Sequence, residues 1–125
     1  IGINNTWAQE DPVVDSVVAG ITRVLEAAHA RKPNARIVLQ SLLPTNDPPR
    51  NRDVVVAVNA RIEALAMRRP YADYTVFLDL YPLFTDSAGS QNAAFFVTDG
   101  VHPNDAGYRV WSGRLLPFLN QLRRQ

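Results

Sequence analysis

Hydrophobic positions three and four residues apart mark three segments of this 125-residue chain as amphipathic helices. The first begins at Asp11-Pro12, an N-cap followed by a proline in the first turn, and ends at Lys32-Pro33. Its apolar face consists of Val14, Val17, Val18, Ile21, Leu25 and Ala28. The same spacing recurs from residue 54 to about residue 69 and from residue 105 to the C-terminus. Each predicted helix therefore has one side that packs on a core.

Two short apolar segments lie between these helices. Residues 36–43 (RIVLQSLL) and 74–80 (YTVFLDL) are mostly aliphatic and are bounded by turn-forming residues. Continuous apolar runs of this length are typical of strands buried on both faces. The polar segment 45–52 (TNDPPRNR) and the segment 81–98 are predicted to be loops.

The order loop, helix, strand, helix, strand, helix predicts an α/β fold with a parallel sheet and helical crossovers. No internal repeat or linker interrupts the pattern, so residues 1–125 are interpreted as belonging to one domain. In such sheets the functional groups gather on loops at the carboxyl ends of the strands. Residues 2–5, the loop after Leu43 and residues 99–104 are expected at that edge.

Charge and composition narrow the possible functions. Thirteen basic and twelve acidic side chains give a net charge of +1 without a run of like charge, which argues against nucleic acid as a partner. The absence of cysteine excludes disulfides and thiolate metal sites. No apolar run approaches the roughly 20 residues of a membrane span. Lys32 is the single lysine, which is typical of a GC-rich bacterial genome, and the compartment stays open between cytoplasm and secretion.

Asp99 and His102 form the first candidate site. A carboxylate three residues before a histidine, in a loop that enters a helix, can accept a hydrogen bond from one imidazole nitrogen. The other nitrogen is then free to act as a general base. The alternative is structural: Asp99 caps the turn and His102 is a solvated loop histidine.

Asn4, in Gly2-Ile3-Asn4-Asn5, is the second candidate. A side-chain amide at a strand end, beside a glycine that permits close approach, can donate to a developing oxyanion. A simple asparagine turn and a glycosylation sequon formed with Thr6 are the alternatives. Trp7 is expected in the core, with the wall of an acyl pocket as the other interpretation. His29, in the last turn of the first helix, is interpreted as structural.

Taken in order, these motifs resemble those of the SGNH hydrolases, also called the GDSL esterase and lipase family. Residues 2–5 (GINN) match the family's third block, G-x-N-D/N, and residues 99–104 (DGVHPN) match its fifth block, D-x-x-H-P. The continuation 106–108 (AGY), the strand end 42–44 (LLP) and Asn59 are also typical. The resemblance is greatest to bacterial proteins similar to the platelet-activating-factor acetylhydrolase catalytic subunit.

The resemblance implies the C-terminal part of a flavodoxin-like three-layer α/β/α sandwich that begins at the third block. It implies a serine esterase in which His102 is the base, Asp99 orients it, and Asn4 stabilises the oxyanion. It implies a small ester substrate with a short acyl group, and no cofactor or metal. The GDS block with the nucleophilic serine and the second-block glycine have no counterpart. The chain's own serines, none in a Gly-Asp-Ser context, are Ser16, Ser41, Ser87, Ser90 and Ser112.

The chain alone is therefore expected to be inactive. Two predicted strands are too few for the family's five-stranded sheet, and segment 36–43 would expose an unpaired edge. We expect an N-terminal segment carrying the GDS serine, as a separate or cleaved chain, or else an exchanged copy of this chain. Two other interpretations stay open: an incomplete subunit that acts only with a partner, and a flavodoxin-like domain that binds a small polar ligand without catalysis.

Overall fold

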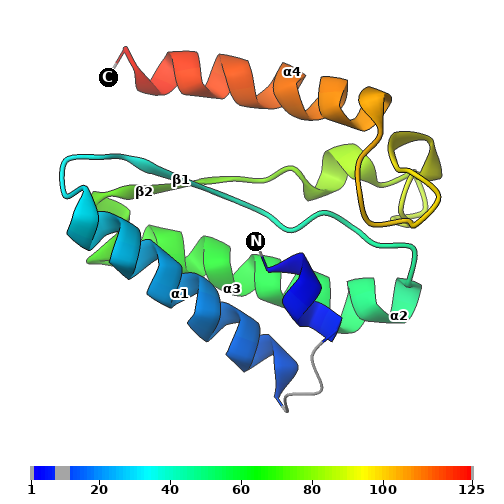
Figure 1. The fold of residues 1–125 in the computed structure, drawn as a ribbon, viewed down its shortest axis with the longest axis horizontal. Helices are drawn as coiled ribbons and strands as arrows, with labels where there is room; N and C mark the ends of the chain where they lie inside the picture. Colours follow the sequence, from blue (N-terminus) through cyan, green and yellow to red (C-terminus); the bar gives the residue numbers. More distant parts are fainter. Residues whose placement is uncertain (1, 8–11, 125) are drawn as a thin grey trace.

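The computed structural model describes residues 2–7 and 12–124 (Figure 1). Four α-helices are described, α1 (Val13–Arg31), α2 (Pro48–Arg50), α3 (Val56–Met67) and α4 (Asp105–Leu122). The strands are β1 (Ile37–Gln40) and β2 (Thr75–Leu78). Four short 3₁₀ turns are η1 (Ile3–Trp7), η3 (Tyr71–Asp73), η4 (Tyr81–Phe84) and η5 (Ala93–Phe95). The predicted helix start at Asp11 lies outside the described residues.

The two strands are parallel, with Ile37 opposite Thr75 and Gln40 opposite Leu78. Both are shorter than predicted. The last ladder bond runs from the N–H of Ser41 to the carbonyl of Leu78 at 3.1 Å. Beyond it, side chains replace strand partners: Ser41 Oγ accepts the N–H of Leu80 at 2.8 Å. The backbone groups of the next residues are therefore satisfied without a ladder.

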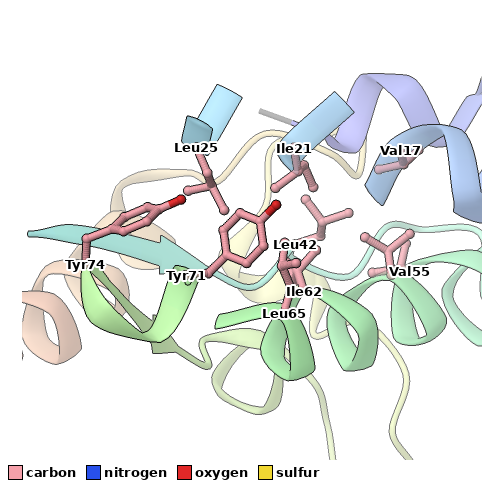
Figure 2. Close-up of a cluster of buried hydrophobic side chains, with 10 residues drawn as sticks. Val17, Ile21, Leu25, Leu42, Val55, Ile62, Leu65, Tyr71 and Tyr74 are labelled. Carbon is pink, nitrogen blue, oxygen red and sulfur yellow. The ribbon is translucent and has the colours of Figure 1, made fainter. Parts of the chain in front are cut away.

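The helices cover both faces of the strands, as the α/β prediction requires. In Figure 1, α1 and α3 lie on one side of β1 and β2, and α4 lies on the other. The larger core is shown in Figure 2, where side chains of α1 and α3 point toward one another around Leu42. Its buried members include Val17, Ile21, Leu25, Leu42, Val55, Val58, Ile62 and Leu65. A second core beneath α4 contains Leu78, Leu80, Phe84 and Phe96.

The second helical region begins earlier than predicted. Segment 45–52 was expected to be a loop, but α2 begins at Pro48 and a π-helical segment, η2 (Asn51–Val55), joins it to α3. Asp47 is the N-cap and its Oδ1 accepts the N–H of Arg50 at 3.1 Å. Proline suits the first helical position because its missing N–H would have no helical partner there. The loop prediction was wrong because these turn-forming residues also make a good helix start.

One edge of β1 has no strand partner among the described residues. Along this edge runs a groove of about 320 Å³, lined by residues of α1, by β1 and by Trp111 of α4. Helix α4 buries only Gly107 fully, while Tyr108 and Leu116 are exposed. The unpaired edge of β1 is therefore surrounded by apolar surface. Folded proteins rarely leave a strand edge exposed in this way.

No helix in the described part of the chain is long and apolar enough to cross a membrane.

Candidate active site

Asp99 and His102 are hydrogen-bonded to each other in the loop that precedes α4. Oδ2 of Asp99 lies 2.7 Å from Nδ1 of His102. Oδ1 accepts the backbone N–H of Val101 at 2.8 Å and that of His102 at 2.9 Å. The carboxylate thus folds the four-residue turn around itself while its second oxygen holds the imidazole. The structure brings these two candidates together, and their catalytic roles stay a prediction.

The turn also keeps the carboxylate ionised. The backbone N–H of His102, then that of Val101 and then the imidazole itself lower the pKa of Asp99 to about 2. An ionised carboxylate can only accept hydrogen bonds, so Nδ1 of His102 must carry the shared proton. The imidazole side chain is 70% exposed, and its Nε2 makes no hydrogen bond within the described residues. The free nitrogen is the one that a general base would use.

Gly100 is required by the shape of this turn. Its φ of +67° lies in the left-handed region, which side chains other than glycine disfavour. A Cβ at this position would also overlap the side chain of Asn46. Both the backbone conformation and the available space therefore select glycine between Asp99 and Val101.

The loop after β1 supports the Asp99–His102 turn. The backbone N–H of Asn46 donates to the carbonyl of Gly100 at 3.2 Å, and Asn46 Nδ2 donates to the carbonyl of Asp99 at 3.3 Å. Asn51 in turn holds Thr45: its Oδ1 accepts from Thr45 N–H at 2.7 Å and its Nδ2 donates to Thr45 carbonyl at 2.7 Å. The sequence predicts this loop at the carboxyl edge of the sheet, but nothing in it indicates a role for Asn46 or Asn51.

Asn59, which the sequence analysis singled out, anchors the start of the same loop. Its Oδ1 accepts the N–H of Leu42 at 2.7 Å, and its Nδ2 donates to the carbonyl of Leu42 at 2.9 Å. These two hydrogen bonds satisfy the backbone N–H and carbonyl of Leu42, just after β1 ends, as a neighbouring strand would. Asn59 therefore fixes where the chain leaves the sheet.

Asn104 fixes where the site loop enters α4. Its Oδ1 accepts the N–H of Gly107 at 3.0 Å, which is an N-cap bond. Its Nδ2 donates to the carbonyls of Ala94 at 2.9 Å and Phe96 at 3.1 Å. The histidine loop is therefore tied both to the helix and to the segment that runs antiparallel to it.

Asn4 is exposed and lies in η1. In Figure 1, η1 (dark blue) and the loop before α4 both lie toward the carboxyl ends of the strands. Gly2, with φ +102°, lets the backbone there pack closely on Leu42. The turn is closed by the N–H of Asn5 bonded to the carbonyl of Gly2 at 3.0 Å. Among the described residues, no hydrogen bond joins Asn4 to Asp99 or His102. Asn4 thus lies toward the same edge of the sheet as the pair, without a hydrogen bond to it among the described residues.

Trp7 does not lie in the core, so that prediction was wrong. The residue is 46% exposed, and the guanidinium of Arg50 lies 3.1 Å from its ring centroid. Arg50 also pairs with Asp47 at 3.4 Å. A cation–π contact with a charged partner keeps the ring at the surface.

Three of the chain's serines and His29 lie outside the Asp99–His102 turn. Ser41 is buried beneath η4 with its hydroxyl bonded to backbone, and Ser87 and Ser90 are exposed on a turn. His29, which was interpreted as structural, is half-buried at the end of α1 and stacks on Tyr74 with ring centroids 3.8 Å apart. Within the described residues, no three side chains of metal-ligand type cluster as an ion site would need.

Comparison with known proteins shows the family of the chain. Residues 1–110 match the sequence profile of the GDSL-like Lipase/Acylhydrolase family. No curated protein matches the chain significantly.

Solved structures share the fold, three of them with TM-scores of 0.68 or 0.69. A Streptococcus pneumonia protein described as a platelet activating factor is 24% identical, with a TM-score of 0.69 over 85% of this chain and 51% of its own. A carbohydrate esterase family 3 protein from Talaromyces cellulolyticus is 28% identical, with a TM-score of 0.68 over 87% of this chain and 49% of its own. An acetyl esterase solved as a serine-to-alanine variant with an acetate ion is 27% identical, with a TM-score of 0.69 over 87% and 49%.

This chain therefore spans about half the length of the structures it matches. Its parallel strands, helices α1 and α3 and its D-x-x-H turn fall within residues 1–110, which the family profile matches. The chain belongs to the GDSL-like lipase/acylhydrolase family.

Proposed function

We propose that the complete protein is a carboxylic ester hydrolase that works through a Ser-His-Asp triad, with the serine outside this chain. The observation that carries the proposal is the 2.7 Å contact between Asp99 Oδ2 and His102 Nδ1. It leaves Nε2 exposed at the carboxyl edge of the sheet, where a serine from another segment can reach it.

In the proposed reaction, His102 Nε2 takes the proton of the serine hydroxyl as the serine oxygen bonds to the ester carbonyl carbon. Asp99 holds the Nδ1–H and stabilises the imidazolium that forms. The side-chain amide of Asn4 donates to the carbonyl oxygen as it becomes negative. The bond between the carbonyl carbon and the alcohol oxygen then breaks, and the imidazolium gives its proton to the departing alcohol. The acyl group stays on the serine until water, deprotonated by His102, attacks it in the same way. This second step releases the acid and returns the proton to the serine.

The proposed substrates are esters with short acyl groups, acetyl among them. Two of the similar structures are an acetyl esterase and a carbohydrate esterase, at 27% and 28% identity. These similarities support a short acyl group in the substrate and do not indicate which alcohol it is esterified to.

The partner we propose is an N-terminal segment that carries the serine and adds a strand beside β1. The β1 edge is unpaired among the described residues, and its groove is lined by apolar side chains such as Ile21, Leu39 and Trp111. A parallel strand laid there would satisfy the backbone groups of β1 and cover this surface. The matching structures, which are about twice as long, support an added segment of this kind.

A fluorophosphonate probe labels only an activated serine. It therefore tests both the proposed esterase chemistry and the proposed location of the serine outside this chain. The chain alone should take no label and hydrolyse p-nitrophenyl acetate no faster than buffer. The complete protein should be labelled on a serine outside residues 1–125. Labelling of the chain alone would contradict the absent serine. A complete protein that takes no label would favour a flavodoxin-like binding domain instead.

Light scattering and mass spectrometry test the partner separately. The 125-residue chain should associate or unfold without the added segment. A well-folded, monodisperse 13.9 kDa monomer would overturn the idea that the β1 edge needs a partner.

A further inference from the structure

Gln91 lies outside the Asp99–His102 turn and yet contacts it. Its backbone forms a short antiparallel bridge with Thr85, and the next residue, Asn92, donates its N–H to the carbonyl of Phe84 at 2.9 Å. Phe84 is fully buried, and its ring packs edge-on against Phe96 with centroids 5.6 Å apart. The backbone of Gln91 is therefore attached to the core beneath α4.

The side-chain amide of Gln91 donates to two carbonyls from different segments. Nε2 lies 2.8 Å from the carbonyl oxygen of Pro44, in the loop after β1, and 2.7 Å from that of Gly100. A glutamine amide has two N–H groups, so these two bonds account for both. Gln91 thus links the sheet edge to the turn that carries the catalytic candidates.

The carbonyl of Gly100 belongs to the peptide unit whose N–H is that of Val101. That N–H donates to Oδ1 of Asp99 at 2.8 Å. A trans peptide is planar and its C=O and N–H point in opposite directions, so holding the oxygen also aims the N–H. Donation to the carbonyl further polarises the unit and strengthens its N–H as a donor.

We propose that Gln91 is a positioning residue, which aims the Gly100–Val101 peptide at Asp99 and thereby sets the orientation of the Asp99–His102 pair. The backbone N–H of Asn46 shares this task, because it donates to the same carbonyl at 3.2 Å. Among the described residues, the Gln91 side chain is hydrogen-bonded to the carbonyl of Gly100 and not to the side chain of Asp99 or His102, so its proposed effect on them passes through the peptide.

The effect on turnover rests on the proposed esterase function, whereas the effect on Asp99 does not. We therefore measure both in the complete protein. Gln91→Met keeps the length of the side chain and removes both donors. Gln91→Glu keeps the shape and, at neutral pH, presents a carboxylate to two carbonyl oxygens. Gln121→Met, at an exposed position of α4, is the control for loss of a glutamine amide.

The first readout is the ¹³C titration of the Asp99 carboxyl by NMR. In the wild type the pKa is about 2, and both Gln91 variants should raise it toward the ordinary aspartate value, while Gln121→Met leaves it unchanged. The second readout is esterase kinetics. Both variants should lower kcat about tenfold or more with KM changed less than about twofold, since misaligned groups cost turnover rather than binding.

A space-filling role for Gln91 would leave Gln91→Met like the wild type, and an unchanged Asp99 titration in that variant would overturn the proposal. If the variants do not fold, the wild type still provides a test. The two Nε2 protons of Gln91 should exchange slowly with solvent, and fast exchange would contradict the two hydrogen bonds to the carbonyls of Pro44 and Gly100. A wild type without esterase activity would reject the proposed function and leave the titration as the test of Gln91.

Discussion

Asp99 contacts His102 twice, through Oδ2 to the ring Nδ1 at 2.7 Å and through Oδ1 to the backbone N–H at 2.9 Å. The carboxylate therefore fixes the backbone from which the imidazole projects as well as the ring itself. A histidine held at both levels has little freedom to turn its Nε2 away, which is the preorganisation that a general base needs. Four predictions test the site built around this pair.

His102→Ala should lower kcat of the complete enzyme by several orders of magnitude, because the base is lost. Stability should change little, since the side chain is 70% exposed. Turnover of a p-nitrophenyl ester and thermal unfolding measure the two effects. His29→Gln is the matched control at the only other histidine, and it should keep at least half of the activity. Wild-type turnover in His102→Ala would reject the assignment.

Asp99→Asn should destabilise the protein only where the carboxylate is ionised. The folded-state pKa of about 2 lies below the roughly 3.9 of an unfolded aspartate, so ionised Asp99 favours the folded state. That stabilisation is complete above about pH 4 and is lost as the pH falls through 2. Urea unfolding from pH 6 to pH 2 should show wild type and variant converging at the acid end. A gap that persists at pH 2 would mean that the carboxylate charge is not what stabilises the turn.

Asn4→Ala should lower kcat about 10²- to 10³-fold in the complete enzyme with KM little changed, which is the usual effect of losing one oxyanion donor. Asn5→Ala is the matched neighbour, because among the described residues Asn5 is bonded in η1 through its backbone N–H, which alanine retains. Steady-state kinetics of both variants separate the roles. A rise in KM at constant kcat would instead make Asn4 a residue that binds substrate.

Gly100→Ala should destabilise the protein more than Gly89→Ala. Both glycines have positive φ, +67° and +78°, so each substitution carries about 1 to 2 kcal/mol of backbone strain. A Cβ at Gly89 meets open space, whereas one at Gly100 overlaps Asn46. We expect an additional loss of at least about 1 kcal/mol at Gly100 from this overlap. Chemical denaturation of the two variants measures the difference, and equal losses would show that the loop simply moves aside.

The sequence was sufficient where the determining interactions are local. Helices α1 and α3 follow from apolar spacing, and Val17, Ile21 and Leu25 of the predicted α1 face are buried. The Asp99–His102 contact was also predictable, because it spans three residues and needs only a turn that glycine permits. Local geometry of this kind depends little on the rest of the fold.

The early helix start shows the limit of local reasoning. Asp47-Pro48 is a turn signal and equally a capped helix start, and only packing of Val55 into the core distinguishes them. Trp7 was expected in the core but lies at the surface against Arg50, which is far along the sequence. A contact of that separation depends on how η1 and α2 meet in three dimensions.

The supports of the site were decided by tertiary structure alone. Gln91 meets Pro44 across 47 residues of sequence, and Asn46 meets Asp99 across 53. Amides of this kind occur in any polar loop, and nothing in their local sequence tells which carbonyl they will reach. The residues of the turn thus determined the Asp99–His102 hydrogen bond by themselves, because among the described residues the Asp99 side chain bonds only to groups of the same turn. The orientation of that turn against the sheet required the fold, because its hydrogen bonds come from segments that only the packed core brings together.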